Sequence, residues 1–336
     1  MTKEEIKRIY NARWQYINRM RVLGEGGMAP HPQPTCSAFY VENKATSNED
    51  ITVRIVKTGS NVKYSFMLSD NGENWTSASA ITSFSVQSGK KKYIKGTINN
   101  ISSSSYITFS SSDNYAIGGN IMSLTNAEDY EETTTISKDF QFFNLFRGDE
   151  KLIDASNLKL PATTLRKYCY RGMFQNCSNL RFAPAELPAR IVPERAYISM
   201  FYNTAISQTP ILRGEELGIY AYSYMFYDCN NLTNISSNLL PASTLNESCY
   251  SSMFEECSNL VHAPELPATT LAHSCYYSMF KGCSSLLATP ALPARNLAHS
   301  CYKLMFADCS KLQESSLLPA TTMINACYSG MFLNCS

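Results

Sequence analysis

The sequence predicts a mixed α/β fold with three successive parts: an N-terminal helix, a β-sandwich and a solenoid of about eight repeats with a period of about 26 residues. Three observations support this prediction. An amphipathic pattern covers residues 2–23, apolar and polar residues alternate over 36–130, and a Met-Phe pair recurs from residue 145 onward. The predicted domains are residues 1–35, 36–135 and 136–336.

Residues 2–23 read as a helix that begins at a capping box formed by Thr2 and Glu5. Gly24 ends it, and a proline-rich extended linker follows over 28–35. The helix could pack on its own domain, anchor the chain to a partner or to sister helices, or lie on a membrane surface. For the second role the candidate anchor residues are Ile6, Ile9, Tyr10, Trp14, Ile17 and Met20.

Residues 36–135 are expected to form a β-sandwich, because six or seven short alternating segments follow one another. The segments cover 51–56, 62–68, 81–86, 92–96, 106–109 and 117–122. Asp70, Gly72 and Trp75 resemble the Asp-box of sialidases, but Leu68 stands where that motif has serine and only one copy is present. We therefore interpret this stretch as a hairpin turn.

The repeats are defined by Met-Phe pairs and by the degenerate first copy Leu145-Phe146. The later pairs begin at Met173, Met200, Met225, Met253, Met279, Met305 and Met331. A nearly constant period with apolar residues in phase predicts stacked layers. Phe140, Phe142, Phe143 and Phe146 are expected to cap the first layer.

Within one repeat, Leu260 and Leu266 are predicted to point inward from a short strand that Pro267 closes. The four-residue spacing of Leu271, Cys275 and Met279 predicts a helical or 3₁₀ turn on the return. Ordering one repeat of this length costs roughly 40 kcal/mol, whereas each apolar anchor returns only about 1.5–3 kcal/mol. Stability therefore has to come from stacking of neighbours.

The phrase Leu-Pro-Ala-Thr-Thr-Leu, followed by Cys-Tyr-x-x-Met-Phe-x-x-Cys-x-x-Leu, resembles the BspA-type (Treponema-type) leucine-rich repeats. Similar proteins occur in gut Bacteroidetes and their crAss-like phages, where an immunoglobulin-like β-domain precedes the repeats. The resemblance covers the repeat region, which is more than half of the chain. It departs in the second copy, where Ala196 and Thr204 replace the two cysteines. The family implies a leucine-rich-repeat solenoid with an extracellular binding surface and no catalytic centre.

Ten cysteines form five pairs that share one spacing, beginning with Cys169 and Cys177. Zinc ligands are usually closer together in the sequence, so we interpret the cysteines as buried free thiols, with disulfides and metal as alternatives. The net charge of +1 and the 17% charged residues predict no nucleic-acid partner. No apolar run predicts membrane insertion, no signal peptide is recognised at the N-terminus, and the repeat region is expected to be incomplete at the C-terminus.

No catalytic, cofactor or metal set is predicted. His273 and His299 fall in the same slot of adjacent repeats and are interpreted as a surface pair. The residues that follow each strand leucine change from copy to copy, which predicts either a binding face or neutral variation on a solvated face. The candidate binding-face residues are Arg181, Phe182, Thr233, Asn234, Val261, His262, Leu287, Gln313 and Glu314.

These patterns favour a non-enzymatic phage virion protein, tail-fibre or head-fibre-like, that binds host-surface glycan or protein through its repeats. Its N-terminal helix would contact other virion proteins, or sister chains in a homo-oligomer. The first alternative is a BspA-like adhesin of the bacterial cell surface or extracellular space. A glycan-processing enzyme is the distant alternative.

Overall fold

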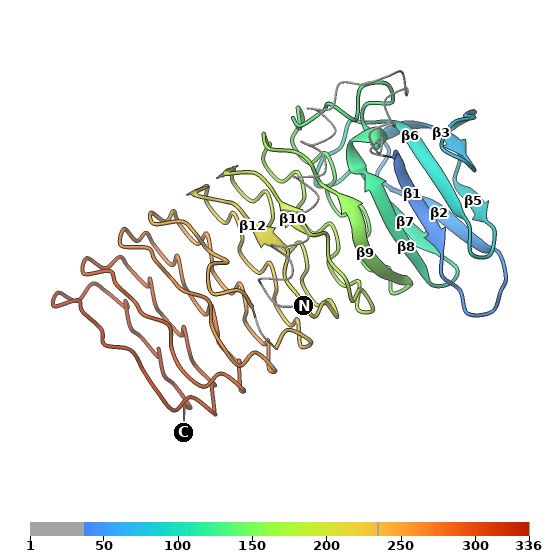
Figure 1. The fold of residues 1–336 in the computed structure, drawn as a ribbon. Coiled ribbons are helices and arrows are strands. Elements are labelled where there is room, and N and C mark those ends of the chain that lie inside the picture. Colours follow the sequence, from blue (N-terminus) through green and yellow to red (C-terminus); the bar gives the residue numbers. More distant parts are fainter. Residues whose placement is uncertain (1–36, 234, 336) are drawn as a thin grey trace, which may run out of the picture. The chain divides into compact units, whose positions relative to one another are not determined.

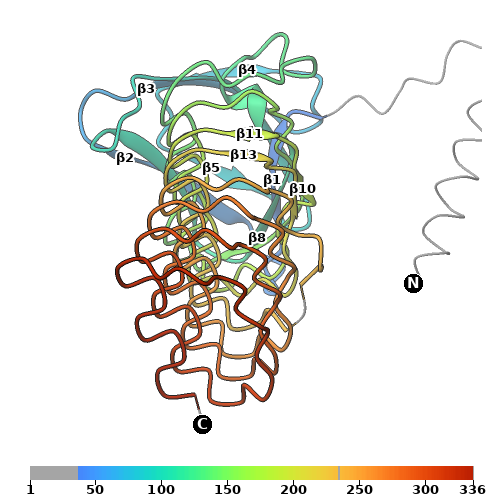
Figure 2. The same cartoon turned by 90° about the vertical axis from the view of Figure 1, so that its left-hand side faces the viewer.

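The computed structural model describes residues 37–233 and 235–335, which belong to one compact unit. The predicted N-terminal helix, with all its candidate anchor residues, lies outside the described residues. The described part begins with a two-sheet β-region and continues as a series of stacked coils (Figure 1). Each coil is one repeat of the chain, and viewed at right angles the coils overlie one another (Figure 2).

The β-region consists of a six-stranded sheet in the order β4-β3-β6-β1-β8-β9 and a three-stranded sheet in the order β5-β2-β7. Six of its strands overlap the segments that the alternation predicts, whereas β1 and β9 were not predicted. Asp70 and Gly72 lie in the hairpin between β3 and β4. The bounds are β1 Phe39–Asn43, β2 Ile51–Thr58, β3 Lys63–Ser69, β4 Thr76–Ser79, β5 Ser83–Val86, β6 Lys91–Asn99, β7 Tyr106–Ser111, β8 Tyr115–Asn120 and β9 Leu152–Lys159.

The two sheets enclose an aromatic core that continues into the first coil. Phe39 and Phe109 come from different sheets, and their ring centroids lie 5.9 Å apart. Phe146 packs against both rings and stacks on Phe174 of the next coil at 5.5 Å. Strand β9 also pairs in parallel with β8. Of the phenylalanines predicted to cap the first layer, Phe142 and Phe146 are buried and stack on rings of the next coil, and Phe146 also packs against the β-region.

The predicted mixed α/β fold is wrong for the described residues. They contain no α-helix, and their only helical element is the 3₁₀ helix η1, Ile121–Leu124. A regular leucine-rich-repeat solenoid is not formed either. Beyond β9 the strands shorten to two residues and give way to isolated bridges and turns. The bounds are β10 Glu186–Leu187, β11 Ile191–Val192, β12 Ile211–Leu212 and β13 Glu216–Leu217.

The segment predicted to be helical is a chain of turns in which every fourth residue is left-handed. In one coil Ser248, Ser252 and Glu256 have φ of 50°, 53° and 63°. The backbone N–H of Met253 donates to Tyr250 O within the coil at 3.2 Å. The N–H of Phe254 donates to Met279 O of the next coil at 2.9 Å. This alternation satisfies the backbone without a helix and joins each coil to its neighbour.

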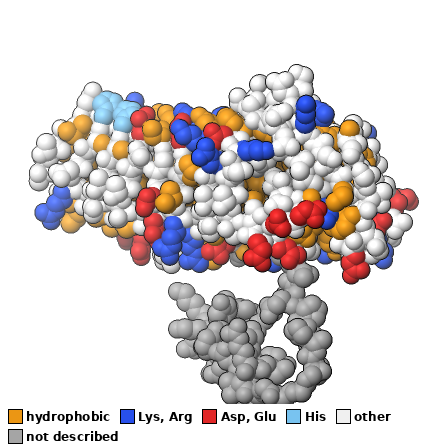
Figure 3. Space-filling model, turned by 90° about the horizontal axis from the view of Figure 1, so that it is seen from above, with side chains coloured by type: hydrophobic (Ala, Val, Ile, Leu, Met, Phe, Trp, Pro, Cys, Tyr) orange, Lys and Arg blue, Asp and Glu red, His pale blue; other side chains and the backbone are white. Residues whose placement is uncertain are grey.

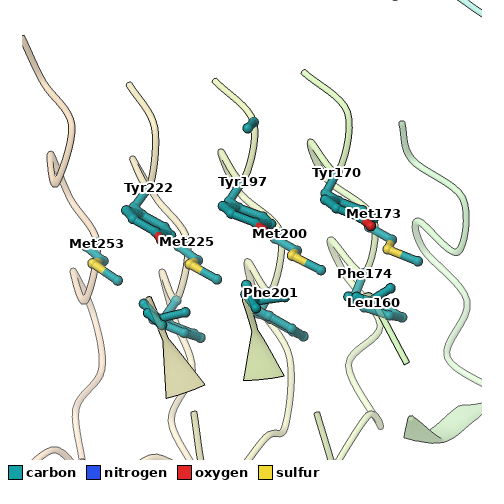
Figure 4. Packing of buried hydrophobic residues seen from close by; sticks show 14 of the residues in the cluster. Leu160, Tyr170, Met173, Phe174, Tyr197, Met200, Phe201, Tyr222, Met225 and Met253 are labelled. Atoms are coloured by element: carbon teal, nitrogen blue, oxygen red, sulfur yellow. The ribbon is translucent and has the colours of Figure 1, made fainter. Parts of the chain in front are cut away.

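Identical side chains stack in columns along the coils (Figure 4). Consecutive phenylalanine rings from Phe146 to Phe332 lie 5.3–5.7 Å apart. Tyrosine rings from Tyr170 to Tyr328 lie 5.5–5.9 Å apart. These centroid distances lie within the favourable range for aromatic pairs. The columns therefore supply the contacts that a single repeat lacks.

Several tyrosine hydroxyls of this column have no hydrogen-bond partner within the described structure, including that of Tyr250. A buried unpaired hydroxyl costs about 1–3 kcal/mol. We expect Tyr250→Phe to raise the free energy of unfolding by about 1 kcal/mol or more in denaturant titrations. The control is Tyr64→Phe, which removes a 2.7 Å bond from the hydroxyl to Ile81 O and should lower stability by about 1 kcal/mol. A loss of stability in both variants would contradict the prediction.

Candidate functional site

The residues predicted for the binding face lie in rows along the coils. The backbone N–H of Val261 donates to Thr233 O at 3.1 Å, and that of Leu287 donates to Val261 O at 3.2 Å. Gln313 continues the row through a 2.9 Å bond to Leu287 O. Four of the predicted residues thus occupy equivalent places in successive coils, with Thr233 and Gln313 exposed and the two apolar members half-buried.

A second row lies directly beside the first. Parallel bridges join His262 to Ala288 and Ala288 to Glu314, and another joins Phe182 to Asp154 of the first coil. Phe182, His262 and Glu314 are exposed. Asn234 lies outside the described residues. We define the variable face as these two rows, whose members are Arg181, Phe182, Thr233, Val261, His262, Leu287, Ala288, Gln313 and Glu314.

The variable face borders an open hollow of about 440 Å³ beside Arg181 and Phe182. A second hollow of about 320 Å³ lies next to it, lined by Arg190, Arg213 and Glu215 among others. Both hollows include Thr209 and Ile211 in their lining. The two hollows together extend from the coil of Arg181 to that of Glu265, because the lining of the second also includes residues 236–241 and Pro267.

Apolar side chains project into solvent around these hollows. Phe182 is 53% exposed, Ile191 60% and Ile211 51%. Arg213 pairs with Glu186 at 2.7 Å and Arg190 with Glu215 at 2.6 Å, both on the surface. Such exposed pairs contribute only about 0–1 kcal/mol to stability. A surface that mixes exposed apolar groups with charged groups is suited to binding, because core stability does not require it.

Sequence reasoning missed the residues around the second hollow, namely Arg190, Ile191, Ile211 and Arg213. A signal was nevertheless present in the sequence. The coil that contains Gly214 replaces the usual Leu-Pro-Ala wording by Leu-Arg-Gly. A Cβ on Gly214 would lie 2.5 Å from the Tyr222 hydroxyl, so this coil packs differently from its neighbours. The signal for the second hollow is therefore a coil that lacks the recurring Leu-Pro-Ala sequence, and not the positions that differ in every coil.

The cysteines of the described residues are free, and all except Cys335 are buried. The thiols that follow the Met-Phe pairs donate to carbonyls of the preceding coil, as Cys257 does to Phe226 O at 3.0 Å. Burial raises the pKa of the Cys169 thiol to about 12. A thiol that stays protonated is a poor nucleophile and a poor metal ligand. In this structure the thiols therefore act as small core groups, the first of the three interpretations.

Within residues 37–233 and 235–335, no group of three or more histidine, cysteine or acidic side chains is arranged to hold a metal ion. No helix in that part of the chain is long and apolar enough to cross a membrane. His273 and His299 lie side by side at the surface, with ring centroids 4.9 Å apart.

Comparison with protein families, with curated proteins and with solved structures finds no match to this chain.

Proposed function

We propose that the chain is a non-enzymatic binding protein whose variable face, together with the adjoining hollows, recognises a glycan or protein on a host cell surface. The observation that supports this proposal is the contrast between the two sides of each coil. Buried positions repeat the same Tyr, Met and Phe, whereas the variable face carries Arg-Phe, Val-His and Gln-Glu in different coils. Constant packing beneath a changing surface is how stacked repeats present binding residues.

The proposed location is a phage particle that infects gut Bacteroidetes. The sequence of the repeats resembles that of proteins from these bacteria and their phages, and this resemblance supports the location. In this proposal other virion proteins hold the N-terminal region, and the coils present the variable face to the host. A BspA-like adhesin on the bacterial cell surface would use the same face, so the two proposals differ in location and not in the binding chemistry.

The test combines a printed glycan array with binding of the full chain to intact Bacteroidetes cells. Phe182→Ser and Ile211→Ser each remove an exposed apolar side chain beside the hollows, and we expect each to weaken binding at least about ten-fold, as for a central contact residue. Val56→Ser is the matched control, because Val56 is 49% exposed and lies on β2 in the β-region.

Two results would count against the proposal. If Val56→Ser weakened glycan or cell binding as much as the other two substitutions, the binding surface would not be the variable face. If the wild-type chain bound no array glycan and no cell, the proposed binding function would be wrong. Release of reducing sugar from a bound glycan would favour the enzyme alternative. Mass spectrometry of purified phage particles separates the two locations, because an adhesin of the bacterial surface would be absent from them.

A further inference from the structure

Two imidazoles from neighbouring coils meet at the surface with their nitrogens in direct contact. His273 Nδ1 and His299 Nδ1 lie 3.1 Å apart, and the planes of the two rings differ by 30°. Both side chains are exposed, and Figure 3 shows histidines gathered on the surface near one end of the coils. The backbone fixes this arrangement, because the N–H of Ser274 donates to His299 O at 3.0 Å.

Flanking serines contact the same rings. Ser300 Oγ lies 3.0 Å from His299 Nδ1, and Ser274 Oγ lies 3.3 Å from His273 Nε2. The Ser274 contact leaves His273 Nδ1 to face the neighbouring imidazole. A hydrogen bond to the second ring nitrogen, as Ser274 offers to His273, orients histidines that bind metal ions. Ser300 instead contacts His299 Nδ1, so a bound ion would have to replace that contact.

Two ring nitrogens this close need either a hydrogen atom, as in an N–H···N bond between neutral imidazoles, or a metal ion between them. Their lone pairs repel unless they share a proton or a metal ion, and two N–H groups would repel in the same way. For metal–nitrogen distances of about 2.0–2.1 Å, a separation of 3.1 Å corresponds to an angle at the metal of about 95–100°. That angle lies close to the right angle between neighbouring ligands in square-planar and tetragonal complexes of Cu²⁺ and Ni²⁺.

We propose that His273 and His299 together bind one divalent transition-metal ion, with Cu²⁺ and Ni²⁺ preferred to Zn²⁺. The two Nδ1 atoms are the protein ligands, and water completes the coordination shell, since the described residues place no third histidine, cysteine or acidic group there. Glu247 occupies the same register position in the preceding coil, because Ser248 N–H donates to His273 O. A carboxylate one coil away adds a favourable charge for a cation.

Such an ion would cross-link two successive coils. The folded chain holds the two imidazoles together, whereas the unfolded chain exposes thiols that also bind such ions, so the affinity of the folded chain and not the melting temperature reports this site. This inference is independent of the proposed function, because neither histidine belongs to the variable face.

The test is calorimetric titration of the untagged full chain with CuCl₂ and NiCl₂, together with electron paramagnetic resonance of the Cu²⁺ form. We expect one site whose spectrum reports two nitrogen ligands. His273→Asn or His299→Asn should weaken binding on the order of 100-fold, because the two ligands act at high effective concentration. Asparagine is compatible with the backbone at this position, since Asn325 occupies the equivalent position in the next coil.

His262→Asn is the matched control, because His262 is an exposed histidine in a different row. It should retain the wild-type metal affinity. Melting without metal shows whether each variant folds. The proposal is overturned if the wild-type chain binds no Cu²⁺ at this site, if either single variant retains the affinity, or if the spectrum reports one nitrogen ligand.

Discussion

Phe254→Ala is expected to lower the free energy of unfolding by about 3–5 kcal/mol, the range for removing a buried aromatic ring from a core. Phe254 is fully buried, and its ring stacks between Phe226 at 5.4 Å and Phe280 at 5.6 Å. Alanine would leave a cavity that both neighbours border, and the stacked backbone resists collapse into it. Denaturant unfolding followed by circular dichroism measures the loss.

The same substitution at the last described coil provides the control. Phe332 is 37% exposed and stacks on Phe306 at 5.7 Å. Because this ring is already partly in water, Phe332→Ala should cost about 1 kcal/mol or less. Equal losses at Phe254 and Phe332 would contradict the view that stacking on both sides, and not the residue type alone, sets the contribution of each ring.

The sequence predicted the stacking but not the local conformation of each coil. Cys275, Met279 and Phe280 are fully buried, as their phase in the repeat indicated. The four-residue spacing was assigned to a helix or 3₁₀ turn, but a left-handed residue at every fourth position produces the same spacing. The deciding interactions are hydrogen bonds to the next coil, one full repeat away in the sequence, which local periodicity does not report.

Tyrosine is a core residue of the repeats. One tyrosine of most coils lies in the core with less than 2% exposure. The repeat itself held the signal, because Tyr250, Tyr276 and Tyr302 each follow a buried cysteine directly. A residue that recurs in phase with core positions belongs to the core, even where its hydroxyl finds no partner.

Candidate site residues could be predicted as a row because register along stacked coils follows from the period alone. Val261, Leu287 and Gln313 follow one another at one full period and are joined by backbone hydrogen bonds. The hollows beside Phe182 and Ile211 could not be predicted in this way. Their lining includes residues of the coil that carries Leu-Arg-Gly in place of Leu-Pro-Ala, and a period alone does not report the shape of the surface between two coils.

Alkaline pH is expected to unfold the protein steeply, because the buried thiols resist ionisation. Burial raises the pKa of the thiols from the usual 9.0 to about 11 for Cys301 and to about 12 for a group of four. That group comprises Cys169, Cys229, Cys249 and Cys309. The folded protein therefore keeps protons that the unfolded chain releases. The resulting stability is fully present below about pH 9 and is lost as the pH rises through 11 to 12.

The size of this effect follows from proton linkage. Each thiol that ionises only in the unfolded chain lowers the free energy of unfolding by about 1.4 kcal/mol per pH unit. Five such thiols together give a slope of at least about 7 kcal/mol per pH unit above pH 9, and Cys177, Cys257, Cys275 and Cys283, whose pKa values burial also raises, add to it. Because a domain is stable by about 5–15 kcal/mol, we expect unfolding within about one to two pH units above that point. Denaturant titrations between pH 7.5 and 10.5, in the presence of a reductant, measure the slope.

Removing one thiol tests the assignment directly. Cys249→Ala should reduce the slope by about 1.4 kcal/mol per pH unit, whereas Cys335→Ala should change it less, because the Cys335 side chain is only partly buried. Ionisation of the buried tyrosines, whose pKa values are also raised by burial, adds to the slope only above about pH 10. A free energy of unfolding that stays constant from pH 8 to 10.5 would show that the thiols ionise equally in both states. The cysteine column would then lie in contact with water and not within the core of the stack.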